Sequence, residues 1–207
     1  MPTYSNDRTC FSRRGALGLV AGAGLLLAAM PAAAQSTAQG QAHVEAAMRD
    51  VLAVVNSGKS TGQAVNDFQR ILSKYADMAI ISRSSLGNAW RSASDAQKRA
   101  YVAAYQPYLA RKYGKRFADF KGSSFAVTRV RDAGNKGVLV EGEARVPGRA
   151  PIAVEFQVSN RSGSIKIYNL IIEGISLLSS EREEIGQMLA ARGNNIDKLT
   201  ADLRTAG

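Results

Sequence analysis

The sequence has 207 residues, of which 45% are hydrophobic, and its formal net charge at neutral pH is +10. This length is typical of one domain with a core of its own. The single cysteine, Cys10, excludes an intramolecular disulfide, and with the single histidine, His43, it also excludes the usual four-ligand Cys/His zinc site.

The first 34 residues have the pattern of an export signal. A basic start, which contains Arg13 and Arg14, leads into a Gly/Ala/Leu-rich stretch from Ala16 to Met30 and then into a run of small residues that ends at Ala34. The apolar stretch is shorter than the roughly 20 residues of a spanning helix, so we expect cleavage near Ala34. The arginine pair favours a twin-arginine signal, and an ordinary Sec signal is the alternative.

The predicted mature chain is still basic. Cleavage would remove Arg8, Arg13, Arg14 and Asp7, three cations and one anion, so the formal charge would fall from +10 to +8. Export argues against nucleic acid as a partner. Two interpretations of the charge remain: a basic protein without a special partner, or attraction to anionic lipid or to an acidic protein.

Helices are predicted in the first half of the mature chain. After a flexible leader over residues 35–42, apolar residues recur at helical spacing over residues 43–58 and again from Thr61 to Tyr75. Residues 77–87 fit a short helix or an irregular turn. Ser94 and Gln97 form a capping box ahead of a helix that could run to Phe120, with a kink or a break at Pro107.

From residue 124 the hydrophobic period changes to two, which predicts four strands. They cover residues 124–132, 136–146, 150–160 and 164–174, and short turns separate them. Such short connections favour an antiparallel meander. The fourth strand is apolar on both faces, and strict alternation puts Ile165, Ile167 and Ile171 on one face and Tyr168, Leu170 and Ile172 on the other.

Two helices are predicted after the sheet. Ser180 and Glu183 resemble a capping box, and Gly193 to Asn195 separates that helix from a last one at residues 196–203. The fold class is therefore α+β, with an antiparallel four-stranded twisted sheet flanked by N-terminal and C-terminal helices that enclose an apolar cavity. One domain is expected over residues 43–204.

Catalytic groups are scarce in the mature sequence. A lone exposed histidine such as His43 is usually a bystander, and no nucleophile–base set is available without it. The carboxylate pairs at Glu141/Glu143 and Glu183/Glu184 fit a solvated strand face and a helix first turn. We therefore predict no catalysis, no metal and no cofactor. The basic run from Arg111 to Arg116 is either a solvated helix face or a contact for an anionic group.

Two stretches resemble the MlaC family, which is associated with toluene tolerance. One runs from Leu86 and Gly87 through Trp90 and Arg91 to Phe120, and the other is the apolar strand that ends in Glu-Gly-x-Ser-Leu and continues into a helix with Arg182. This chain departs from the family pattern at Asn169, where aspartate is usual, at Ser180 and Glu181, which replace Asn-Tyr, and at Ile185, which replaces phenylalanine.

The resemblance implies a monomeric periplasmic carrier without enzymatic activity. It would take phospholipid, as cargo, between an outer-membrane lipoprotein–porin complex and an inner-membrane ABC transporter complex, and so maintain the lipid asymmetry of the outer membrane. We expect the acyl chains to lie between the sheet and the helices, against Trp90, Tyr105, Tyr108, Leu109, Tyr113, Phe117, Val140, Val154, Phe156, Ile167 and Ile171. The headgroup or a partner would meet Arg91, Arg111, Lys115 and Arg182.

Three alternatives stay open from the sequence. A related branch of the family is associated with hopanoid lipids and keeps the fold. The others are a periplasmic adaptor that binds no lipid and an enzyme that acts on lipid substrates. The identity of the lipid, the direction of transport and the apolar face that lines the cavity do not follow from the sequence.

Overall fold

The computed structural model describes residues 32–207, with side chains from residue 37 onward. The predicted export signal therefore lies almost entirely outside the described residues, and its cleavage stays a prediction. Within residues 32–207, no helix combines the length and the apolar character needed to cross a bilayer.

The chain forms helices, then a sheet, then helices. The first group comprises α1 (Ala32–Val55), α2 (Thr61–Tyr75), α3 (Met78–Leu86), α4 (Ala89–Ser92), α5 (Asp95–Gly114) and the 3₁₀ turn η1 (Phe117–Phe120). The sheet contains β1 (Ser124–Asp132), the 3₁₀ turn η2 (Gly134–Lys136), β2 (Val138–Arg145), β3 (Ile152–Ser159), β4 (Lys166–Ile172) and β5 (Ile175–Ser176). Helices α6 (Leu177–Ala190) and α7 (Ile196–Leu203) follow.

The predicted α+β fold and antiparallel meander are confirmed, with one strand more than expected. The five strands are hydrogen-bonded in the order β1-β2-β3-β4-β5, and each pair is antiparallel. The extra strand exists because Glu173 and Gly174 both have positive φ angles, 49° and 78°. This tight turn returns the chain so that Ile175 and Ser176 pair with the end of β4.

Three helix predictions need correction. Residues 35–42 are not a separate leader but part of α1. Helix α5 runs from Asp95 to Gly114 without a break at Pro107. It does not reach Phe120, because residues Phe117–Phe120 form the separate 3₁₀ turn η1. The cap of helix α6 is Ser176, four residues before the predicted Ser180, and its side chain accepts a hydrogen bond from Ser179 N.

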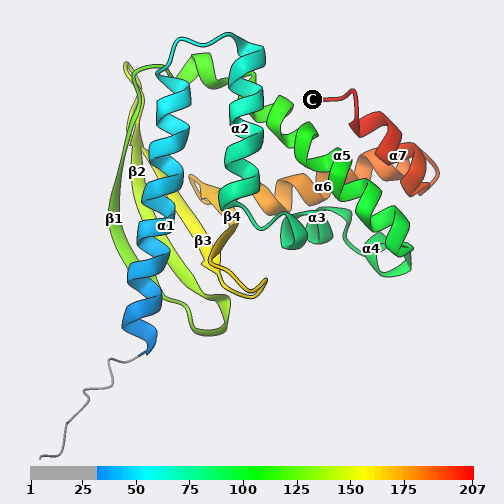
Figure 1. Cartoon of the computed structure of the whole chain (residues 1–207), viewed down its shortest axis with the longest axis horizontal. Coiled ribbons are helices and arrows are strands. Elements are labelled where there is room, and N and C mark those ends of the chain that lie inside the picture. The colour runs from blue at the N-terminus through cyan, green and yellow to red at the C-terminus, as the bar shows by residue number, and fades with distance from the viewer. Residues whose placement is uncertain (1–31) are drawn as a thin grey trace, which may run out of the picture. The chain divides into compact units, whose positions relative to one another are not determined.

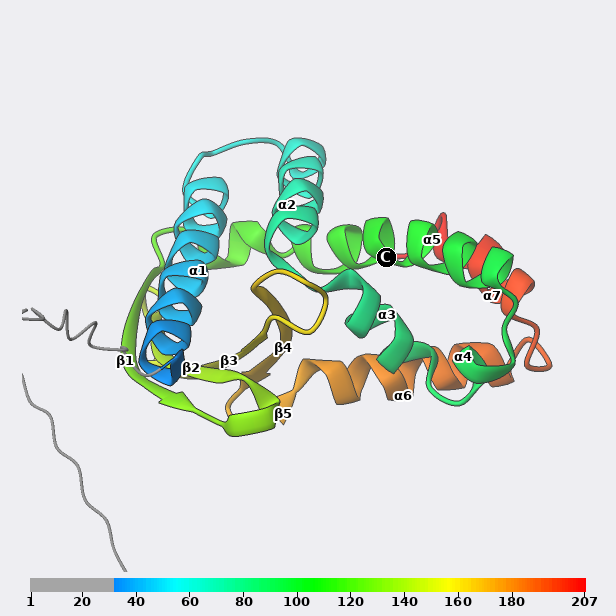
Figure 2. The same cartoon turned by 60° about the horizontal axis from the view of Figure 1, so that its bottom comes forward.

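The elements form two packed regions. Helix α1 lies along one face of the sheet, while α3 to α7 gather beyond β4, and α2 stands between them (Figures 1 and 2). We call the first hydrophobic cluster the sheet core; its buried members are Val44, Val138, Val140, Val154, Phe156 and Val158. The helical core is the cluster of buried side chains from α3, α5, α6 and α7 and their connections, including Leu86, Tyr101, Tyr105, Tyr108, Leu109, Ile185, Leu189, Leu199 and Leu203.

Two glycines allow close packing on the face of the sheet that α1 covers, Gly40 between α1 and β2 and Gly142 within the sheet. A Cβ added at Gly40 would lie 2.9 Å from Val138 Cγ1, and at Gly142 it would lie 2.3 Å from Phe125 Cζ. The Phe125 ring therefore covers Gly142 and meets Phe156 edge-on, with ring centroids 5.6 Å apart. This packing fills the part of the sheet under α1 with protein side chains.

Candidate functional site

The residues predicted to contact lipid divide between the two cores. Tyr105, Tyr108 and Leu109 are buried in the helical core, and Trp90 and Tyr113 pack against it. Val140, Val154 and Phe156 are buried in the sheet core, and Ile167 packs against it. Phe117 meets Phe68 of α2 edge-on at 4.8 Å between ring centroids. The structure thus does not gather these side chains into one pocket.

Strand β4 is where packing by protein is least complete. All seven of its residues, from Lys166 to Ile172, are half-buried, whereas β2 and β3 each contain fully buried positions. Beyond β3, the strand neighbour of β4 is the two-residue β5, which pairs only with Ile171 and Ile172, so most of β4 lies at the edge of the sheet. The side chains of β4 therefore present apolar surface that the described part of the chain covers only in part.

A bulge determines which side chains of β4 face α1. Val158 pairs with Ile167 while its neighbour Gln157 pairs with Asn169, so Tyr168 is the extra residue. Directly paired residues share a face, so Ile167 and Leu170 join the face of the sheet core. The strict alternation expected from the sequence was wrong here, since it separated these two side chains.

Ile171 lies on the other face of the sheet. It pairs with Glu155, and Glu155 pairs with Glu141, so its neighbours across the strands are acidic. Arg131 bridges these two carboxylates, with Nε 2.6 Å from Glu141 and an Nη atom 3.4 Å from Glu155. The surroundings of Ile171 on this face are polar and are unsuited to long apolar groups.

Half-buried apolar side chains lie on three elements, α1, α2 and β4. We call them the apolar belt: Met48, Val51 and Leu52 of α1, Val65, Phe68, Ile71 and Leu72 of α2, and Ile167, Leu170 and Ile172 of β4. Met48, Ile167 and Leu170 pack against the sheet core, and Leu72 packs against the helical core. The apolar belt therefore occupies the boundary between the two cores.

Polar contacts at the end of α2 fix one side of this boundary. Asp77 N donates to the carbonyl of Ile167 at 2.8 Å, and Ala76 forms a parallel bridge with the same residue. His43 is half-buried rather than exposed as predicted, because its ring packs edge-on against Tyr75 and its Nε2 lies 3.1 Å from the Tyr75 carbonyl oxygen. His43 thus connects α1 to the end of α2.

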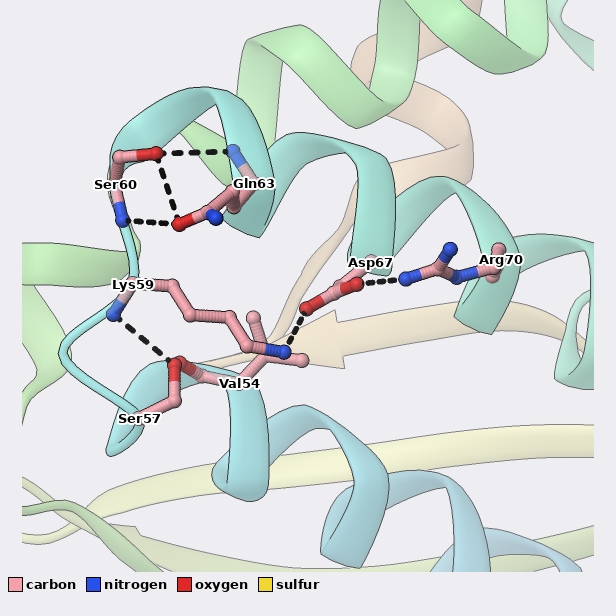
Figure 3. Close-up of polar contacts among 7 residues, drawn as sticks. All are labelled: Val54, Ser57, Lys59, Ser60, Gln63, Asp67 and Arg70. Atoms are coloured by element: carbon pink, nitrogen blue, oxygen red, sulfur yellow. Dashed lines mark hydrogen bonds and ion pairs between the residues drawn. The ribbon is translucent and has the colours of Figure 1, made fainter.

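The turn between α1 and α2 is held by several side-chain contacts (Figure 3). Ser60 and Gln63 form a capping box at the start of α2. This cap was not among the predictions from the sequence. Lys59 Nζ lies 2.6 Å from the carboxylate of Asp67, which also pairs with Arg70. Both cations donate hydrogen bonds to Asp67 and so lower the pKa of its carboxyl group, and the bond from Lys59 has the larger effect. These contacts couple the two helices that carry most of the apolar belt.

A buried polar cluster joins α5 to α6 on the helical side. The carboxylate of Glu181, only 3% exposed, accepts hydrogen bonds from Tyr105 at 3.0 Å, Tyr113 at 2.6 Å and Lys112 at 2.6 Å. Lys112 also donates to Glu184, which accepts a further bond from Tyr108 at 2.6 Å. The buried negative charge is therefore compensated, and the cluster fixes the position of the two helices.

The pKa values in this cluster follow from burial and hydrogen bonding. Burial raises the pKa of the Tyr105 and Tyr113 hydroxyls, and the neighbouring Glu181 raises it further. Burial alone would raise the pKa of Glu184, but hydrogen bonds from Lys112 and Tyr108 outweigh it and lower that pKa. Burial likewise opposes the charge on Lys112, whereas its two carboxylate partners raise its pKa. These shifts keep Lys112 and Glu184 charged and the tyrosines neutral near neutral pH.

The four predicted headgroup contacts have different surroundings. Arg111 donates to the carbonyls of Leu203 and Ala206 at 2.6 and 2.8 Å, and Lys115 donates to the carbonyl of Gly207. Both are therefore engaged with the segment that follows α7. Arg91 and Arg182 are exposed and make no ion pair or side-chain hydrogen bond within residues 37–207.

Described residues line two surface grooves. One, of about 410 Å³, is lined by Trp90, Lys98, Arg99, Val102, Ala103 and Gln106 of α4 and α5. The other, of about 330 Å³, lies where the start of α1 meets the β1–β2 and β3–β4 turns. The expected acyl-chain site therefore does not coincide with either groove.

Groups that could support other chemistry are sparse in the described residues. Between residues 37 and 207, no three His, Cys, Asp or Glu side chains come together as a metal site would require. Glu141 pairs with Arg131, and Glu143 lies 2.6 Å from Arg145, so the predicted structural role of this carboxylate pair agrees with their positions. What the geometry offers is apolar surface between two cores.

Comparison with known proteins gives two findings. A family model described as "MlaC protein" matches residues 45–205. Among solved structures, the chain is similar to the phospholipid-binding protein from Ralstonia solanacearum in complex with a phospholipid, with 22% sequence identity and a TM-score of 0.66. The match covers 79% of this chain and 98% of the Ralstonia protein, so the two share their fold.

Proposed function

Because this chain belongs to the MlaC family, we propose that it is a periplasmic phospholipid carrier that binds its cargo against the apolar belt. The half-buried state of every residue of β4 is the observation that carries this proposal. A solved protein of the same fold is described as phospholipid-binding, which supports the same assignment.

The energetics require a site between protein surfaces. Each methylene of an acyl chain costs about 0.8 kcal/mol in water, so a 16-carbon chain costs on the order of 13 kcal/mol, and a carrier must cover almost all of it. The apolar belt offers branched side chains from α1, α2 and β4 to one acyl chain or more. Since the belt lies between two cores that are each packed within themselves, a guest can enter there without disrupting either one.

The bulge in β4 supports one face of the sheet over the other as the contact for cargo. Ile167 and Leu170 face α1 and continue the sheet core, whereas Ile171 faces Glu155. We therefore assign the acyl chains to the α1 side. Of the residues first expected to contact lipid, this retains Ile167 and leaves Ile171 outside the site.

Membership of the family supports a proposal for the wider role. We propose that the carrier takes lipid between an outer-membrane complex and an inner-membrane ABC transporter and that it catalyses no reaction. A hopanoid-type lipid in the same site is the second candidate, because the belt consists of branched aliphatic side chains, one methionine and one phenylalanine, which fit a rigid ring system as well as a flexible chain.

Three asparagine variants test the site. Leu170→Asn places an amide on the α1 side of β4, Ile171→Asn places it on the opposite side, and Ile175→Asn is the control because Ile175 is already 63% exposed. Co-purifying lipid is measured by native mass spectrometry and by lipid extraction, per mole of protein shown to be folded by circular dichroism.

We expect wild-type protein, Ile171→Asn and Ile175→Asn to carry phospholipid. Leu170→Asn should carry at most about one fifth of the wild-type amount, since an unpaired amide would face the acyl chain. If Ile171→Asn alone lost its lipid, the cargo would lie on the face opposite to α1, and our assignment would be wrong. Absence of any lipid from folded wild-type protein, after purification from a periplasm, would contradict the carrier function. A hopanoid instead of a phospholipid in the extract would favour the second candidate.

A further inference from the structure

The groove between α4 and α5 combines an aromatic side chain, small apolar residues and two cations. Trp90 and Val102 contribute apolar surface, and Lys98 Nζ lies over the indole ring at 5.9 Å from its centroid. Arg99 is exposed on the rim, and Arg91 is exposed next to Trp90 in the chain.

The charge of this surface is not neutralised locally. Arg91 and Arg99 make no ion pair or side-chain hydrogen bond in the part of the chain that the structure describes. The acidic side chain that pairs with a groove cation is Asp95, at 3.4 Å from Lys98 Nζ and 84% exposed. By contrast, the arginines Arg131 and Arg145 on the polar face of the sheet pair with carboxylates 2.6 Å away.

The position of the groove separates it from the proposed cargo site. Helix α4 and the first half of α5 lie at the end of the helical region that points away from the sheet, in both views of the molecule (Figures 1 and 2). The apolar belt lies on the sheet side of that region, on α1, α2 and β4. A contact at the groove therefore leaves the belt free.

We infer that the α4–α5 groove docks this protein on the surface of a membrane rich in anionic lipid, with Trp90 at the level of the headgroups and Arg91, Lys98 and Arg99 against lipid phosphates. Tryptophan prefers the interface between headgroups and acyl chains, and cations beside it add electrostatic attraction. A groove this open suits a planar, deformable surface better than a protein partner, whose docking depends on close shape complementarity.

Trp90 is the only tryptophan in the sequence, so its fluorescence reports directly from the proposed contact. Full mature protein, loaded with lipid, is mixed with vesicles of phosphatidylcholine alone or of phosphatidylcholine with 30 mol% phosphatidylglycerol. Binding is followed by co-sedimentation and by the emission of Trp90, and bromine-labelled acyl chains in the vesicles test its depth by quenching. We expect binding and a blue shift only with phosphatidylglycerol, and we expect high salt to reverse both.

Charge reversal distinguishes the groove from the general positive charge of the chain. Arg99→Glu should reduce partitioning onto phosphatidylglycerol vesicles by about fivefold or more, since each cation contributes about that factor. Arg129→Glu is the matched control, with the same change at an exposed arginine of β1, and should bind nearly as well as wild type. Arg99→Lys should also bind.

Four results would overturn the inference: no phosphatidylglycerol-dependent binding, equal losses in Arg99→Glu and Arg129→Glu, Trp90 emission unchanged in bound protein, or binding to a helical peptide with glutamates along one side in preference to vesicles. The last result would identify an acidic protein partner instead. Lipid occupancy of Arg99→Glu should equal that of wild type, so failure here is separable from failure of the carrier function.

Discussion

The helical core and the apolar belt differ in how completely the protein itself covers their side chains. In the helical core, large side chains are buried and their polar atoms are paired, as with Tyr105, which is fully buried and donates to Glu181. In the belt, side chains of similar hydrophobicity, such as Leu170, remain half-buried at the boundary of two cores. A protein that must hold a removable apolar guest needs both: a frame that stays folded when the guest leaves, and a surface that the guest completes.

The largest effect is expected where the frame compensates a buried charge. Lys112→Met leaves the buried Glu181 with tyrosine donors but without its cation, and removing one partner of a buried pair costs about 3–5 kcal/mol. Chemical denaturation with the exposed Lys198→Met as control measures this cost. If the two variants lost stability equally, the helical region would not depend on its buried charge pair.

A matched pair of truncations compares the two regions directly. Leu109→Ala opens a cavity in the helical core, where Leu109 is 5% exposed, and should lower the free energy of unfolding by about 2–5 kcal/mol. Leu170→Ala removes the same atoms from a half-buried position in β4 and should cost less than half as much in lipid-free protein. Added lipid should widen the stability gap between wild type and Leu170→Ala. Equal costs without lipid would show that β4 is packed as tightly as the core.

Helix caps test whether the α1–α2 hairpin is held locally. Ser60→Ala removes the capping box in Figure 3 and should cost about 1 kcal/mol, with faster hydrogen exchange confined to α2. Ser94→Ala removes the equivalent box from α5 and should cost about the same, with faster exchange in the first turn of α5. Exchange that rose throughout the helical region in Ser60→Ala would mean that α2 does not open independently.

The smallest effect is expected from Glu184 in acid. Its pKa is lowered in the folded protein, so it contributes stability that is complete above its unfolded pKa of about 4.3 and is lost as the pH falls through the folded value. With 43% of its side chain exposed, we expect less than about 1 kcal/mol. The free energy of unfolding is measured at pH 6 and pH 3.5 for wild type, Glu184→Gln and the control Glu183→Gln. Between these pH values Glu184→Gln should lose less stability than wild type. An identical loss would show that Glu184 does not contribute to the pH dependence.

Much of the fold follows from local patterns in the sequence. The bounds of β1, the alternation of β2 and β3, and the cap of α5 at Ser94 and Gln97 depend on neighbouring residues, and the structure confirms them. The bulge at Tyr168 could not be predicted in this way, because pairing with β3 produces it. Nor could the burial of Glu181, whose tyrosine and lysine partners lie 68 to 76 residues away in the chain.

The candidate site was less predictable than the fold. Periodicity finds apolar residues but does not distinguish those that other side chains cover from those left at a boundary. Val140 and Val154 were therefore placed with Ile167, although the first two are buried in the sheet core and the third is half-buried. The switch of Ile171 to the polar face follows from the same bulge. The close approach of α1 to the sheet at Gly40 gave no periodic signal, because Gly40 lies in residues 35–42, which were predicted to be a flexible leader.

The bulge in β4 also bears on how the length of this strand can vary among relatives. Tyr168 has no partner in β3, so a chain without this residue can keep Val158 opposite Ile167 and Gln157 opposite Asn169. Its loss would remove the hydrogen bond from its hydroxyl to the carbonyl of Lys136 but would leave the same side chains toward α1. A one-residue gap at Tyr168 is therefore a difference in length that natural selection can accept without changing the surface that meets the cargo.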